Sequence, residues 1–110
     1  MATNLPTKPA SMSEALGRLW SKFLPEIENR TTILEGAVRA LTSGSLSNEE
    51  REAAHQAAHK LAGVLGTFGL QRGTELARQA ELAFADEQPA HASELSSWVG
   101  ELRSLIESRK

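Results

Sequence analysis

The spacing of the apolar residues is the feature that most constrains how this chain can fold. From Ser11 onward, apolar residues recur three or four positions apart, as they do along one face of an α-helix, and no stretch alternates between apolar and polar residues as a strand does. Polar and glycine-containing segments divide this pattern into four or five amphipathic helices with short connections. The sequence therefore predicts an all-α fold, an antiparallel four-helix bundle with an additional N-terminal helix or a kinked first helix.

Local signals predict where some of these helices begin and end. Pro25 interrupts the first apolar run, because its ring prevents a backbone hydrogen bond to the preceding turn, and so predicts a kink or a break. Ser47, followed by Glu50 three residues later, has the pattern of a capping box and predicts a helix that starts near Asn48. Gly69 is suited to end that helix.

The chain is predicted to form one domain after a short arm. Residues 1–11 are rich in Pro, Thr, Ser and Ala and lack periodicity, so we expect a disordered arm or the remnant of a linker there, followed by the bundle over residues 12–110. A chain of 110 residues can bury about two-thirds of its unfolded surface in one core. We expect a monomer, because every strong apolar stripe is needed to close the bundle.

Composition and charge exclude several classes of function. The chain has no cysteine, which excludes disulfides and thiolate zinc sites. A net charge of −2 and a pI of about 5.9 give no electrostatic reason to expect binding to nucleic acid or to an anionic membrane. No apolar run approaches the roughly 20 residues that span a bilayer, and the first residues do not form a secretory signal. We therefore expect a cytoplasmic protein.

Two glycines inside a helical pattern mark the region that a bundle alone does not explain. Gly63 and Gly66 each cost about 1 kcal/mol relative to alanine in a helix interior, so another property must be gained there. Projected at about 100° per residue, both lie on the same face as His59, opposite the apolar residues of that helix. We expect an exposed imidazole beside a lane with almost no side chains, onto which another protein could dock. The expected docking residues are His55, Gln56, Lys60, Ala62, Gly63, Gly66 and Thr67.

An exposed imidazole of this kind is a candidate nucleophile. The neutral form of an imidazole has a ring nitrogen with a lone pair that can attack phosphorus. Phosphoryl transfer also needs positioned positive charge, usually Mg²⁺, and the sequence shows no acidic cluster to hold the ion. The partner would have to supply it.

These residues resemble the signature of a known family. In histidine phosphotransfer (HPt) domains of bacterial two-component phosphorelays, an exposed histidine opens a His-x-Leu-x-Gly motif that is followed by a further glycine. The matching positions here are His59, Leu61, Gly63 and Gly69. The similarity continues more weakly over residues 30–41 and at Leu70, Leu76 and Glu81, and covers about half of the chain.

The resemblance implies a four-helix bundle that carries a phosphoryl group. His59 would accept the group on its distal ring nitrogen from the aspartate of a response-regulator receiver domain and pass it to another receiver. Because no ATP-binding motif is present, the chain would be a carrier and not a stand-alone kinase. The chain itself would bind no cofactor, and Mg²⁺ would lie in the receiver. A hybrid histidine kinase is a further implied partner.

Two alternatives remain open at this point. Many members of the family have a lysine three residues after the histidine, where this chain has Ala62, which keeps open a non-catalytic helical module that binds a receiver without accepting phosphate. His55 and His59 are four positions apart and could share a zinc ion, but the segment lacks the glutamate of a metalloprotease motif, and His91 is the only other histidine. We therefore expect no metal site.

Overall fold

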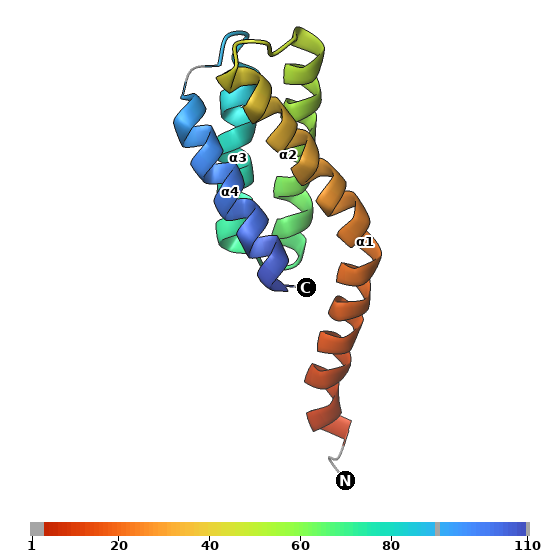
Figure 1. The fold of residues 1–110 in the computed structure, drawn as a ribbon. Helices are drawn as coiled ribbons and strands as arrows, with labels where there is room; N and C mark the ends of the chain where they lie inside the picture. The colour runs from red at the N-terminus through yellow and green to blue at the C-terminus, as the bar shows by residue number, and fades with distance from the viewer. Residues whose placement is uncertain (1–3, 90, 110) are drawn as a thin grey trace.

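The four helices of this computed structural model form an antiparallel bundle. The structure describes the backbone of residues 4–89 and 91–109, and the side chains from Met12 onward within that range. Its helices are α1 (Asn4–Thr42), α2 (Asn48–Thr67), α3 (Gln71–Ala85) and α4 (Ala92–Arg109), and the described residues contain no strand. Helices α1 and α3 each contact both α2 and α4, so the four close into a ring around one core (Figure 1). The predicted all-α bundle is confirmed.

The predicted start and end of α2 are confirmed in atomic detail. The Ser47 hydroxyl accepts a hydrogen bond from the backbone N–H of Glu50 at 3.0 Å, and the Glu50 carboxylate accepts one from the backbone N–H of Ser47 at 2.8 Å. These contacts lower the pKa of Glu50, because they stabilise its charged form. At the other end, Gly69 adopts a φ of +73°, which glycine tolerates without a steric penalty.

Side chains from all four helices form the core. They are mostly aliphatic or alanine, and the alanines let α2 and α3 approach each other closely. Trp20 is buried and packs edge-on against Phe68, with ring centroids 5.3 Å apart, whereas Trp98 is only partly buried against the core. The largest fully buried side chains are those of Ile27, Thr31, Leu34, Leu61, Leu65, Leu76, Phe84, Leu95, Leu102 and Ile106.

Helix α1 is bent, which is one of the two alternatives predicted at Pro25, but it begins earlier than predicted. It continues through Pro25 without a break, and Figure 1 shows its axis change direction about midway along its length. It also begins at Asn4, so most of the expected arm over residues 1–11 has helical backbone; Pro6 falls in the first turn, where a backbone N–H has no intrahelical acceptor in any case. Residues 1–3 lie outside the described residues.

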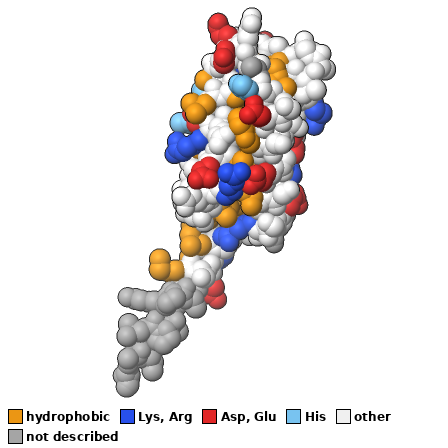
Figure 2. Space-filling view, turned by 90° about the vertical axis from the view of Figure 1, so that its left-hand side faces the viewer, with side chains coloured by type: hydrophobic (Ala, Val, Ile, Leu, Met, Phe, Trp, Pro, Cys, Tyr) orange, Lys and Arg blue, Asp and Glu red, His pale blue; other side chains and the backbone are white. Residues whose placement is uncertain are grey.

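The N-terminal part of α1 before Trp20 projects beyond the bundle, and several apolar side chains on this part and beside Trp20 are exposed. Met12 is 67% exposed, and Leu16, Leu19 and Phe23 are exposed as well. Figure 2 shows hydrophobic side chains on this projecting part, next to the grey segment. The expectation that every apolar stripe closes the bundle is therefore wrong for this stretch. The monomeric state stays a prediction, but these exposed residues remove the reason given for it. No helix in the described part of the chain is long and apolar enough to cross a bilayer.

An ion pair between α1 and α4 makes stability depend on pH. Arg103 on α4 donates to both carboxylate oxygens of Glu35 on α1, from Nε at 3.0 Å and from Nη2 at 2.8 Å. The hydrogen bonds from Arg103 hold the pKa of Glu35 below its ordinary value. Because the pKa of Glu35 is lower in the folded state than in the unfolded state, the ion pair stabilises the fold at pH values above the unfolded-state pKa. This stabilisation is lost as pH falls through the folded-state pKa.

We expect Glu35→Gln to lower the free energy of unfolding by up to about 1 kcal/mol near neutral pH, since the pair is only partly buried. In strong acid the difference between the variant and the wild type should shrink toward zero, because the native carboxylate is then protonated and the ion pair is lost. Urea unfolding at both pH values measures the two differences. A difference of equal size at both would contradict this assignment.

Candidate functional site

His59 stands on an exposed face of α2 and is held by a residue of α3. Its side chain is 66% exposed, as predicted, and its Nδ1 lies 2.7 Å from Oε2 of Glu81. A carboxylate can only accept, so Nδ1 carries the proton and donates it. In a neutral ring with that proton position, Nε2 keeps the lone pair. The geometry therefore leaves the distal nitrogen as the atom of this ring that is able to accept a bond.

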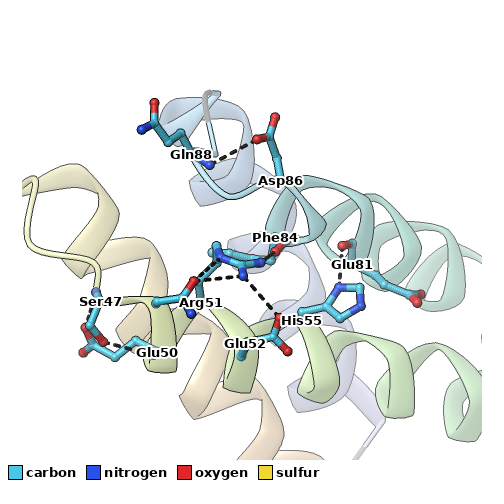
Figure 3. Close-up of polar contacts among 10 residues, drawn as sticks. Ser47, Glu50, Arg51, Glu52, His55, Glu81, Phe84, Asp86 and Gln88 are labelled. Atoms are coloured by element: carbon cyan, nitrogen blue, oxygen red, sulfur yellow. Dashed lines mark hydrogen bonds and ion pairs between the residues drawn. The ribbon is translucent and has the colours of Figure 1, made fainter.

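His55, one turn earlier on α2, is also held by Glu81 but through a different atom. Its Nδ1 lies 3.0 Å from the backbone carbonyl oxygen of Glu81, and its ring is half-buried. Figure 3 shows the His55 ring reaching from α2 toward the main chain of α3, while the Glu81 side chain extends away from it. A carbonyl also can only accept, so the His55 ring likewise donates from Nδ1.

The glycines beside His59 form an open lane. Gly63 and Gly66 are both exposed, as predicted. No described atom outside its own helical neighbourhood lies within 4 Å of the position that a Cβ would take at Gly63, and at Gly66 the nearest is Thr74 Oγ1 at 3.5 Å. The Thr67 hydroxyl, also on this exposed side, donates to the Gly63 carbonyl at 3.2 Å. A partner's backbone can approach α2 here without displacing a side chain.

Ala62 is a correction to the predicted docking face. It is buried, with 3% of its surface exposed, and belongs to the core. The hydroxyl of Thr74 on α3 donates to the Ala62 carbonyl at 3.3 Å. The projection placed Ala62 at the edge of the histidine face, and that edge is where α3 packs against α2. Ala62 therefore presents no surface to a partner.

The other predicted docking residues are accessible but do not all lie on one side of His59. Gln56 and Lys60 are exposed and line a shallow hollow between α1 and α2, together with Arg30 and Asn29 of α1. His55 lies on the opposite side, against α3. Exposed docking candidates thus flank His59 toward α1 and continue along α2 through the glycine lane.

Glu81 contacts both histidines but was not among the site residues predicted from the sequence. It was named only as one of the weaker matches to the family. A signal for it exists in the chain. His59 lies 11 positions before Leu70 and Glu81 lies 11 positions after it. Residues at equal distances from the turn of an antiparallel helix pair lie at the same height, because both helices rise about 1.5 Å per residue. The turn at Gly69 therefore pairs these two positions.

Arg51 is a buried charge with a structural role next to this region. Only 6% of its surface is exposed, and its Nη1 donates to the carbonyl of Phe84 at 2.6 Å, near the C-terminal end of α3 (Figure 3). Its Nε and Nη2 donate to Asn48 Oδ1 at 3.3 and 3.0 Å. A cation at a helix C-terminus binds carbonyls that lack an intrahelical partner and is favoured by the helix dipole. Arg51 therefore fixes the register of α2 against α3, on which the histidine contacts depend.

The chain is similar to one known domain family over most of its length. The family model described as the Hpt domain matches residues 18–109. Among curated proteins, Protein RcaC of Microchaete diplosiphon is 34% identical over 95 residues, a match that covers 84% of this chain and 15% of RcaC. The chain thus spans a small part of that relative's length. No solved structure matches the chain significantly.

Proposed function

This chain belongs to the Hpt domain family, and from that premise we propose that it carries a phosphoryl group between receiver domains of a two-component phosphorelay. His59 is the residue that carries the group. The observation that supports this most directly is an imidazole that is 66% exposed, with Nδ1 held by Glu81 and Nε2 left with the lone pair. A carrier needs a nucleophilic nitrogen that two different partners can reach in turn, and this geometry provides one.

The transfer step follows from the chemistry of the two reacting groups. The Nε2 lone pair of His59 attacks the phosphorus of an aspartyl phosphate on the receiver. A P–N bond forms while the bond between phosphorus and the aspartate oxygen breaks, and the aspartate leaves as a carboxylate with that electron pair. The ring becomes positively charged while Nδ1 still holds its proton, and the Glu81 carboxylate stabilises that charge. Transfer onward to a second receiver is the same step in reverse.

The receiver supplies what this chain lacks. Mg²⁺ bound in the receiver would offset the charge of the phosphoryl oxygens. The docking surface on this chain comprises the exposed candidates around the lane, namely Gln56, Lys60, Gly63, Gly66 and Thr67. His55 lies at its α3 edge.

Transfer of label between proteins tests the proposal. A receiver charged by a small phosphodonor and Mg²⁺ is incubated with the chain, and the chain is examined for label that is acid-labile and base-stable, as a phosphorylated imidazole is. Such label supports the carrier. The rival is a non-catalytic module that binds a receiver without accepting phosphate, suggested by alanine at position 62, and binding of the receiver without label would support that rival instead.

We expect Glu81→Ala to slow the transfer about 10- to 100-fold, the rate equivalent of losing the roughly 1.5–3 kcal/mol that a hydrogen bond to a charged group contributes. The ring would then lose both its orientation and its fixed proton position. Single-turnover transfer at saturating receiver measures the rate separately from binding. Glu75→Ala is the matched control, because Glu75 is an exposed carboxylate on the same helix that pairs with Arg72. Equal slowing in both variants would contradict the role of Glu81.

A further inference from the structure

We propose that His55 and His59 together bind a late first-row divalent metal ion, such as Zn²⁺ or Cu²⁺, through the Nε2 atoms of both rings. Residues four positions apart on a helix lie one above the other on the same face, at a spacing that lets two imidazoles reach one ion. Nδ1 of each ring also contacts the same residue of α3, Glu81. Both rings are thus held against α3 at a single residue, one turn apart on α2.

The proton positions suit both histidines to metal binding, because a proton on Nδ1 leaves the lone pair on Nε2. His59 donates from Nδ1 to a carboxylate at 2.7 Å, and His55 donates from Nδ1 to a backbone carbonyl at 3.0 Å. Histidines that bind metals almost always donate the N–H of their other ring nitrogen to a carboxylate, a backbone carbonyl or water, which fixes the proton position and raises the basicity of the binding nitrogen. The sequence suggested no metal site because the segment lacks the glutamate of a metalloprotease motif and His91 is the only other histidine. The structure adds the acceptors that prepare both rings.

The number of ligands defines the kind of site. Among the residues that the structure describes, no group of three or more His, Cys, Asp or Glu side chains is arranged to hold a metal ion. Water would therefore complete the coordination of an ion held by two imidazoles. Imidazole favours Cu²⁺, Ni²⁺ and Zn²⁺, whereas Mg²⁺ prefers oxygen ligands, so the Mg²⁺ needed by a receiver would not compete.

Metal binding would block the proposed carrier, and this consequence rests on the proposed function. A metal bound at Nε2 of His59 occupies the lone pair that attacks phosphorus. A rise in the free concentration of such an ion would then lower the fraction of chain able to accept a phosphoryl group. The site would make phosphotransfer sensitive to transition metals at the acceptor atom itself.

Calorimetric titration of the whole unphosphorylated chain with Zn²⁺ tests the site without reference to phosphotransfer. We expect one ion per chain, binding at least about tenfold weaker in His55→Gln and in His59→Gln, and no binding of Mg²⁺. His91→Gln is the matched control, because His91 is 65% exposed and its Nδ1 also lies 2.7 Å from a carboxylate, that of Glu94, but it has no histidine one turn away. Its affinity should equal that of the wild type.

The outcomes separate the metal site from the carrier function. Unchanged affinity in His55→Gln, or an equal loss in His91→Gln, would overturn the site whether or not the chain accepts label. If label is accepted, Zn²⁺ should slow labelling of the wild type at least about tenfold more than labelling of His55→Gln, each compared with its own metal-free rate. Equal inhibition of both proteins would overturn the two-histidine site.

Discussion

The His59→Gln variant is expected to accept no label from a charged receiver while remaining folded. Glutamine has no ring nitrogen with a nucleophilic lone pair, so the P–N bond cannot form. The side chain is 66% exposed and outside the core, so the free energy of unfolding should change by no more than about 0.5 kcal/mol. Label counting and urea unfolding on the same preparation measure the two results.

His91 provides a demanding control for this experiment. It matches His59 in exposure, 65% against 66%, and in the 2.7 Å contact between Nδ1 and a carboxylate. It immediately precedes α4, away from the glycine lane. His91→Gln should keep full labelling. If label persisted in His59→Gln and disappeared in His91→Gln, His91 would carry the phosphoryl group, and the glycine lane would not mark the site.

Gly63→Trp is expected to abolish transfer without unfolding the bundle. No described atom outside the local helix lies within 4 Å of a Cβ at this position, so the indole projects outward over the lane and blocks the approach of a receiver. Trp also has a better helix propensity than Gly, so the free energy of unfolding should not fall. Gly63→Ala should stabilise the chain by up to about 1 kcal/mol and retain transfer, because a methyl group leaves the lane nearly as open.

Gly100→Trp is the matched control for the added indole. Gly100 is also an exposed helical glycine, and no described atom outside its local helix lies within 4 Å of the position that a Cβ would take there, but it lies on α4. Its variant should transfer label at the wild-type rate. Receiver binding, measured by titration, should weaken only when the indole is at position 63. Unimpaired binding and transfer in Gly63→Trp would place the receiver on another face.

Local sequence signals predicted the parts of the fold that depend on neighbouring residues. The capping box at Ser47 and Glu50, the turn at Gly69 and the exposure of His59 each follow from a few adjacent positions or from helical periodicity. The structure differs from the prediction at the expected arm, because the proline-containing segment there continues α1. At Pro25, where a kink or a break was predicted, α1 is continuous and its axis changes direction about midway along its length.

The parts that the sequence could not predict depend on how helices pack against each other. Ala62 lies within about 60° of His59 on a helical projection, but whether that angle is covered depends on where α3 crosses α2. The contact between His59 and Glu81 needs the register of the same pair of helices, which the buried Arg51 helps to fix. Helical periodicity predicts on which face of its own helix a residue lies, but not which residue of another helix packs against it.

The double contact of Glu81 has a consequence for how position 81 tolerates change. Its link to His55 comes from the main chain, which every amino acid provides, whereas its link to His59 disappears with the carboxylate. A homologue with a residue other than Glu or Asp at position 81 would keep the contact that orients the His55 ring and would lose the contact that orients the His59 ring. A substitution at this one position can thus change the orientation of the His59 ring without changing that of the His55 ring.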